Sequence, residues 1–127
     1  MAEVLIVDDS ADAREPLGRF LEKLGHVVRA APCGREALDQ LIAKAPDVVL
    51  LDLMMPEMSG ADFLALARSY LRFRSLPVVV LTALSSSPAL DRVRELGAHS
   101  VLLKSKATFE EIRQALEEAA RSDGAAP

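Results

Sequence analysis

The sequence predicts an α/β domain in which a parallel sheet carries helices on both faces. Short, valine-rich apolar runs alternate five times with segments whose apolar residues recur at helical spacing. Apolar runs with few polar interruptions are typical of strands buried on both faces, as in a parallel sheet. The chain of 127 residues is the size of one domain, so this alternation indicates a single doubly wound (βα)5 domain.

The first strand is expected at residues 4–7, and the first helix begins near Ser10 and ends at Gly25. Four apolar residues define one face of this helix: Leu17, Phe20, Leu21 and Leu24. Pro16 lies inside the stretch, where it is expected to kink the helix or delay its start. The second strand covers residues 27–28, and the second helix follows Gly34 with an apolar face of Ala37, Leu38, Leu41 and Ile42.

The third strand is expected at residues 48–51. Ser59 caps the helix that follows, and the apolar face of that helix consists of Phe63, Ala67 and Leu71. The fourth strand, at residues 78–81, precedes a helix with Ser87 as its cap and Pro88 at its first position. Leu90 and Val93 lie on the apolar face of this fourth helix, and Gly97 ends it.

The fifth strand is expected at residues 101–103, and a capping box of Thr108 and Glu111 begins the last helix. Its apolar face consists of Phe109, Ile112 and Leu116. We place the domain at residues 1–121 and a loose tail at residues 122–127. Three arginines near the third helix are expected to lie on a solvated face: Arg68, Arg72 and Arg74.

Composition excludes several functions. The chain has 15 Lys and Arg against 19 Asp and Glu, a net charge of -4, which disfavours direct binding to nucleic acid. The single cysteine, Cys33, excludes an intramolecular disulfide and fits a reducing compartment such as the cytoplasm. The first residues lack the pattern of a signal peptide, and no apolar stretch is long enough for membrane insertion.

Polar side chains follow four of the five predicted strands. Asp8 and Asp9 come after the first strand, Asp52 after the third, Thr82 after the fourth and Lys104 after the fifth. Because parallel strands end at the same edge of a sheet, we expect these side chains to meet there. Each residue alone is more often a turn residue, a cap or a solvated charge. Their joint occurrence at four strand ends favours a single site.

The predicted cluster fits phosphoryl transfer. Converging carboxylates repel one another unless they share a cation, and Mg²⁺, or Mn²⁺ in its place, suits such oxygen ligands. An aspartate is itself able to act as the nucleophile and form an aspartyl-phosphate. Lys104 and Thr82 supply a positive charge and a hydroxyl for the phosphoryl oxygens. We therefore interpret Asp52 as the phosphoacceptor.

From residue 4 to about residue 120 the chain resembles the receiver domain of two-component response regulators. The resemblance depends on residues 7–10 (VDDS), 49–60 (VLLDLMMPEMSG), 80–83 (VLTA), 95–98 (ELGA) and 103–104 (LK). It implies a flavodoxin-like sheet of order 2-1-3-4-5 and a cytoplasmic signalling protein. The resemblance also implies that the chain is not otherwise an enzyme, since a receiver catalyses only its own phosphorylation and dephosphorylation. The implied partners are a histidine kinase or phosphotransfer protein and an unknown downstream protein.

The resemblance also implies a role for each site residue. Asp8, Asp9, Asp52 and the backbone carbonyl of Met54 hold Mg²⁺. Asp52 accepts the phosphoryl group from a phosphohistidine, Thr82 is the switch hydroxyl, and Lys104 contacts the phosphoryl group.

Two residues depart from the pattern of the family. Val101 stands where receivers usually carry Tyr or Phe, and Ser105 stands where proline usually follows the lysine in a cis peptide. With serine the cis form costs about 3–4 kcal/mol, so we predict a trans bond between Lys104 and Ser105. Val101 is unable to act as the usual aromatic switch, so we expect the response to phosphate to depend on Thr82 and residues 83–88.

Three other functions compete with this interpretation. A hydrolase of the haloacid dehalogenase type also uses an aspartyl-phosphate, but it has its nucleophile on the first strand and a second Asp where this chain has Met54. A flavin-binding electron carrier of similar architecture needs phosphate-binding hydroxyls in the first loop, which here holds Asp8 and Asp9. A receiver-like scaffold that is never phosphorylated stays open because of Val101 and Ser105.

Overall fold

The computed structural model describes residues 1–125, with side chains described through residue 121. Its five strands are parallel and lie in the order β2-β1-β3-β4-β5, which confirms the predicted topology. The strands are β1 (Glu3–Val7), β2 (Val27–Ala31), β3 (Val48–Asp52), β4 (Val78–Thr82) and β5 (Ser100–Leu103). The helices are α1 (Ala11–Lys23), α2 (Gly34–Ala43), α3 (Gly60–Arg68), the 3-10 turn η1 (Leu71–Phe73), α4 (Pro88–Glu95) and α5 (Phe109–Ala125).

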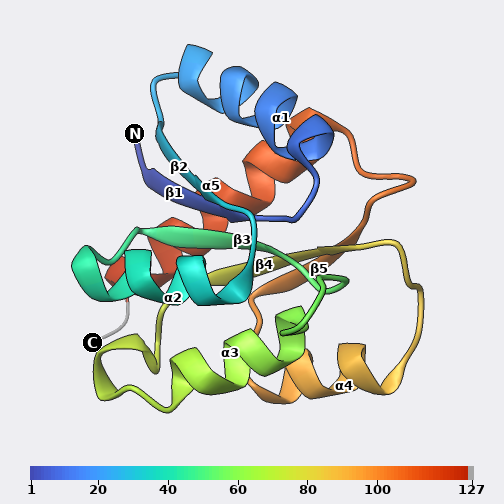
Figure 1. Ribbon diagram of the computed structural model, residues 1–127. Coiled ribbons are helices and arrows are strands. Elements are labelled where there is room, and N and C mark those ends of the chain that lie inside the picture. The colour runs from blue at the N-terminus through green and yellow to red at the C-terminus, as the bar shows by residue number, and fades with distance from the viewer. Residues whose placement is uncertain (126–127) are drawn as a thin grey trace.

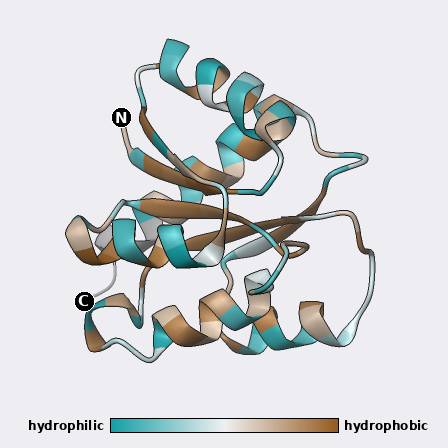
Figure 2. Ribbon diagram, viewed as in Figure 1, coloured by the Kyte–Doolittle hydropathy of each residue, from teal (hydrophilic) through white to brown (hydrophobic). Residues whose placement is uncertain are grey.

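The helices form two layers around the sheet (Figure 1). Helices α1 and α5 cover one face, where Leu21 and Leu116 pack against Ile6 and Leu50. Helices α2, α3 and α4 cover the other face, where Phe63 is buried among residues of β1, β3 and β4. Figure 2 shows the central strands as the most continuous hydrophobic part of the chain. The predicted burial on both faces is present in the three central strands, β1, β3 and β4. The edge strands β2 and β5 are only partly buried.

The predicted helix caps are present. The side chains of Ser59 and Ser87 accept hydrogen bonds from the N–H groups of Asp62 (3.1 Å) and Leu90 (3.2 Å). Thr108 and Glu111 form the expected reciprocal capping box, with distances of 2.9 Å and 3.0 Å. Pro16 lies inside α1 and does not delay its start, because Ser10 caps the helix at Ala11.

The third helix is shorter than its apolar pattern predicts. It ends at Arg68, and Leu71, expected on its apolar face, belongs to η1 and is 79% exposed. The chain turns at Ser69, and this turn brings Phe73 into the core, where it is fully buried. Ile42 and Leu24, at the ends of their helices, are also exposed rather than buried.

Arg68 does not lie on a solvated face, and that prediction was wrong for this residue. Its guanidinium donates to the carbonyls of Phe73 (2.8 Å), Leu76 (2.7 Å), Leu96 (2.8 Å) and Gly97 (3.4 Å). Burial lowers the pKa of this guanidinium below its usual value. The side chain thereby joins the end of α3 to η1 and to the end of α4. Arg72 and Arg74 are exposed, as expected.

Two further predictions concern the carboxyl-terminal part of the chain. The peptide bond between Lys104 and Ser105 is trans, as predicted. Helix α5 continues to Ala125, so residues 122–125 extend the helix rather than form a loose tail. Residues 126–127 of the predicted tail lie outside the described residues. Within residues 1–125, no helix is both long and apolar enough to cross a membrane.

Candidate functional site

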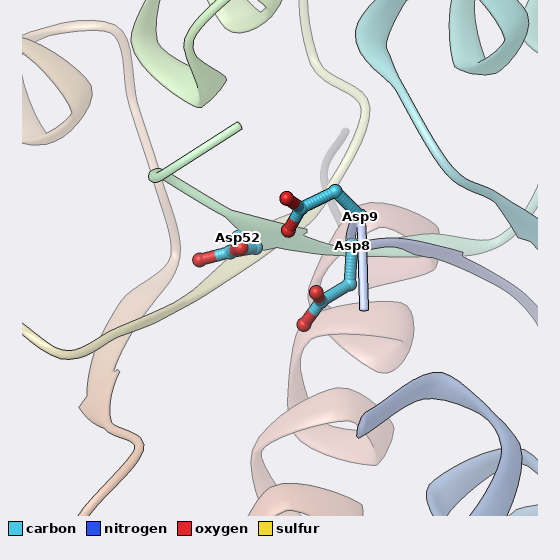
Figure 3. A group of neighbouring side chains, drawn as sticks. All are labelled: Asp8, Asp9 and Asp52. Atoms are coloured by element: carbon cyan, nitrogen blue, oxygen red, sulfur yellow. The ribbon is translucent and has the colours of Figure 1, made fainter. Parts of the chain in front are cut away.

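Three carboxylates meet at the carboxyl edge of the sheet (Figure 3). Asp8 and Asp9 follow β1 directly, and Asp52 is the last residue of the neighbouring strand β3. One oxygen from each carboxylate lies within 4.8 Å of the others. Asp8 and Asp52 are only 4% and 3% exposed, whereas Asp9 faces solvent. The predicted convergence of these residues is therefore present.

Lys104 supplies the positive charge of the cluster. It follows β5, and its Nζ lies 3.0 Å from Asp8 Oδ2 and 3.5 Å from Asp52 Oδ2. Its backbone N–H donates to the carbonyl of Thr82 at 2.8 Å, which extends the pairing of β4 with β5 by one residue. The lysine side chain thus reaches the ends of β1 and β3 from the edge of the sheet.

The pKa values of both Asp52 and Lys104 are raised, because burial dominates at the acid and the neighbouring carboxylates dominate at the base. Burial, with the nearby Asp8 carboxylate, raises the pKa of Asp52 although Lys104 and the Met54 N–H oppose it. Burial acts to lower the pKa of Lys104, but the hydrogen bond with Asp8 and the charges of Asp52 and Asp8 outweigh it and raise that pKa. The folded protein therefore holds an ionised Asp52 at a cost in stability.

This cost predicts how stability depends on pH. Because the folded state raises the pKa of Asp52 above 3.8, Asp52 favours folding most at low pH, and this contribution is lost as the pH rises through the folded-state pKa. The metal-free variant Asp52→Asn is therefore expected to melt at a higher temperature than the wild type at neutral pH. Thermal denaturation from neutral pH down to about pH 4 should show this advantage shrinking.

The matched control is Asp39→Asn, which removes an exposed carboxylate of α2 with the same change in net charge. We expect no comparable gain from it. If Asp39→Asn stabilises the protein as much as Asp52→Asn does, the effect comes from net charge rather than from the buried site.

Thr82 lies at the same edge of the sheet and is fully buried. Asp52 is paired with Leu81, so Thr82 lies one position further along the neighbouring strand β4. Its Oγ1 accepts a hydrogen bond from the N–H of Leu84 at 3.1 Å. The hydroxyl is thus held by the loop that connects β4 with α4.

The loop after Asp52 folds back tightly against its own start. Met54, whose carbonyl is the predicted metal ligand, donates its backbone N–H to Asp52 Oδ1 at 3.3 Å. The N–H of Gly60 donates to the carbonyl of Leu53 at 2.9 Å. A Cβ atom on Gly60 would lie 2.4 Å from the carbonyl oxygen of Asp52, closer than any side chain permits. Only glycine fits at this position without displacing the backbone of Asp52.

Sequence reasoning missed two groups that hold Asp8. The backbone N–H of Ser10 donates to Asp8 Oδ1 at 2.9 Å, and Arg14 Nη1 donates to the Asp8 carbonyl at 2.7 Å. The sequence places Ser10 only near the start of the first helix, and the structure shows that it caps this helix as well. Arg14 gives no signal in the sequence, because an arginine on an exposed helix face is ordinary.

A doubly wound α/β domain with a buried aspartate, an acidic pair and a lysine at its carboxyl edge belongs to the class of phosphoacceptor domains. Residues 4–117 match the family model described as the response regulator receiver domain. The chain therefore belongs to the family of response regulator receiver domains.

Individual relatives support the assignment to this family. Response regulator MprA of Mycolicibacterium vanbaalenii is 38% identical over 125 residues, which are 96% of this chain and 53% of that protein. Protein-glutamate methylesterase/protein-glutamine glutaminase 2 of Carboxydothermus hydrogenoformans is 37% identical, over 95% of this chain and 37% of that protein. The crystal structure of the Vibrio cholerae chemotaxis protein CheY4 has a TM-score of 0.86 and 31% identity, over 94% of this chain and 98% of that one.

The chain spans about half the length of MprA and a smaller share of the methylesterase. Its match is to the receiver family, which has a signalling role, interacts with histidine kinases or phosphotransfer proteins, and in general binds Mg²⁺. This membership sets aside the hydrolase and the flavin carrier. The flavodoxin-like fold expected from the sequence is confirmed by the match to CheY4.

Proposed function

We propose that Asp52 accepts a phosphoryl group from a phosphohistidine of a histidine kinase or phosphotransfer protein. In this step an Asp52 carboxylate oxygen forms a bond to phosphorus while the P–N bond breaks, and the imidazole nitrogen keeps the electron pair. The observation that supports this assignment is the position of Asp52, which is buried between the acidic pair and Lys104. The negative charge that the phosphoryl group adds at Asp52 then alters the binding of the domain to a downstream protein.

The donor set of the site fits a hard divalent cation. Asp8 and Asp52 are buried carboxylates beside the exposed Asp9, and a single lysine does not balance three negative charges. In the proposal Asp8, Asp9, Asp52 and the Met54 carbonyl hold Mg²⁺, or Mn²⁺ in its place. The bound cation supplies positive charge that offsets the negative charge of the phosphoryl oxygens.

Lys104 and Thr82 act on the phosphoryl group directly in this proposal. Lys104 already lies 3.5 Å from Asp52, so its ammonium is placed to contact a phosphoryl oxygen on that side chain. Thr82 donates its hydroxyl hydrogen to another oxygen as the switch residue. Both groups stabilise the charge that spreads over the equatorial oxygens during transfer.

The proposed setting is a cytoplasmic signalling protein that binds other proteins, with neither direct contact to nucleic acid nor insertion into a membrane. The free Cys33 and the net charge of -4 support this setting. We place the receiver at residues 1–121. The chain is not proposed to catalyse any reaction other than phosphorylation and dephosphorylation of its own aspartate.

The test is incubation of the purified chain with acetyl phosphate and Mg²⁺, followed by mass spectrometry. We expect one phosphoryl group per chain, on the peptide that contains Asp52 and labile to hydroxylamine, as an acyl phosphate is. The alternative is a receiver-like scaffold that is never phosphorylated. No incorporation from acetyl phosphate, and none from a panel of histidine kinases, would favour the scaffold and overturn the proposal.

Metal binding is expected to depend on Asp9 far more than on Glu57. Asp9 belongs to the acidic cluster, whereas Glu57 is exposed on the loop after Asp52. Isothermal titration with Mg²⁺ should show Asp9→Asn binding at least about tenfold more weakly and Glu57→Gln binding nearly as the wild type does. Equal losses in the two variants would mean that the cluster does not hold the ion.

The response to phosphate is expected in residues 83–88 rather than on β5. A Thr82 hydroxyl that turns toward the phosphoryl group changes its contact with the Leu84 N–H, so the loop must rearrange. Val101 is packed against the core beneath α4 and has no polar tip to move. Amide chemical shifts with beryllofluoride and Mg²⁺ should change most in this loop and in the first turn of α4.

The control is Asp52→Asn treated with the same reagents. The amide chemical shifts of residues 83–88 should not change in this variant. Large changes centred on Val101 and α5, with residues 83–88 unaffected, would contradict the expected route. A change confined to the phosphate contacts would support the scaffold alternative.

A further inference from the structure

The carbonyl group of Asp8 is fixed by a side chain rather than by the sheet. The ladders of β1 with β2 and β3 end at Val7, and the last backbone contact beyond them is the Asp8 N–H to the Ala31 carbonyl, 3.1 Å. Strand pairing therefore holds the N–H side of Asp8 only. On the other side, the half-buried Arg14 reaches back from α1 and donates to the Asp8 carbonyl at 2.7 Å.

This carbonyl belongs to the peptide unit that joins the two acidic residues. A peptide unit is planar, so a fixed Asp8 carbonyl also fixes the N–H and the Cα atom of Asp9. The carboxylate of Asp8 is separately held by the Ser10 N–H and Lys104. Asp9 is exposed, and its direction depends on the orientation of this peptide.

We propose that Arg14 is a positioning residue for the acidic pair, which orients the Asp8–Asp9 peptide so that both carboxylates face the same cation. This role depends on the metal site of the proposed function. The hydrogen bond is charge-assisted and has the length expected of a strong one, so it resists rotation of the peptide. Groups that orient metal ligands without touching the metal usually change metal affinity about 10–100-fold when they are removed.

The sign of the effect separates this role from simple electrostatics. A positive charge close to the cluster repels a cation, so loss of the Arg14 charge alone would strengthen Mg²⁺ binding. Loss of the positioning hydrogen bond weakens it. The two effects oppose each other, and a net loss of affinity on removal of Arg14 is explained by positioning alone.

The test is a titration of the full chain with Mg²⁺ alone, followed by amide chemical shifts near Asp8 and Asp52. Arg14→Met removes the donors and keeps an unbranched stem. The matched control is Arg19→Met, which makes the same charge change on an exposed arginine of the same helix. We expect Arg14→Met to bind Mg²⁺ about tenfold more weakly than the wild type, and Arg19→Met to bind it as well or slightly better.

Two further measurements guard against a merely structural effect. Arg14→Lys keeps a charged donor and is expected to recover part of the lost affinity. Hydrogen exchange of the Asp9 amide in the metal-free protein should be faster in Arg14→Met, with unchanged exchange in the central strands. Circular dichroism confirms that each variant is folded, and if Arg14→Met is not, the comparison of Arg14→Lys with the control variant decides.

Three results would overturn the proposal. If the wild type binds Mg²⁺ and Arg14→Met binds it as well as Arg19→Met does, Arg14 has no positioning role, and the proposed function stays intact. Tighter binding of Mg²⁺ by Arg14→Met than by the wild type would leave only a charge effect. A wild type that neither binds Mg²⁺ nor takes up phosphate refutes both proposals.

Discussion

Replacement of Asp52 with asparagine is expected to abolish phosphorylation of the chain. The amide has nearly the same shape as the carboxylate, but its oxygen is a much weaker nucleophile, so the acyl phosphate does not form. With Mg²⁺ and acetyl phosphate, incorporation should fall by at least about 1,000-fold, since removal of the nucleophile of a group-transfer site costs up to about 10⁶-fold. Intact-protein mass spectrometry or radiolabelled donor measures this directly.

The matched control for this experiment is Asp12→Asn, which removes an exposed carboxylate from the first turn of α1. Its phosphorylation should proceed at the rate of the wild type. Uptake by Asp52→Asn equal to that of the wild type would show that another residue is the acceptor. Since metal-free Asp52→Asn is also expected to be more stable than the metal-free wild type at neutral pH, a loss of phosphorylation would not result from unfolding of the variant.

Replacement of Gly60 with alanine is expected to have the largest effect on stability. The added Cβ would lie 2.4 Å from the Asp52 carbonyl oxygen and 2.7 Å from Leu53 Cα, and both are backbone atoms that cannot rotate away. Relief of this overlap must move either the start of α3 or the end of β3. We expect a loss of about 2–3 kcal/mol in the free energy of unfolding, measured by urea denaturation, together with slower phosphorylation.

Gly18→Ala is the control, because Gly18 is buried in α1 and its Cβ would lie 3.6 Å from the nearest atom, Val28 Cγ1. Alanine is favoured over glycine inside a helix by about 1 kcal/mol, so this variant should be as stable as the wild type or more stable. A Gly60→Ala protein with unchanged stability would mean that the loop after Asp52 shifts freely, contrary to its tight hydrogen bonding.

Most of the fold could be predicted because local patterns and tertiary packing agree along most of the chain. The helix caps at Ser59, Ser87 and Thr108 are local in sequence, so the structure confirms them. The end of α3 is different. The apolar spacing continues to Leu71, but whether Leu71 or Phe73 enters the core depends on space between elements, which periodicity does not describe.

Much of the candidate site was predicted for a topological reason. Parallel strands end at one edge, so residues that follow strands converge there regardless of the distance between them in sequence. Asp8, Asp52 and Lys104 meet on these grounds. The contacts that orient them were not predicted, because Arg14 and the Leu84 N–H act through the backbone of loops whose shape no short motif specifies.

The hydrogen bonds of Arg68 form a joint between the end of α3 and the end of α4, and this joint should respond little to pH and salt. Its four acceptors are carbonyl oxygens, which do not titrate, and its charge persists because an arginine remains protonated at any ordinary pH. Acid and moderate salt should therefore leave this joint intact. The exposed pair of Arg92 with Asp62, which also links α4 to α3, loses its attraction under both conditions. Beside their apolar packing, the two helices thus share one polar contact that is sensitive to ionic conditions and one that is not.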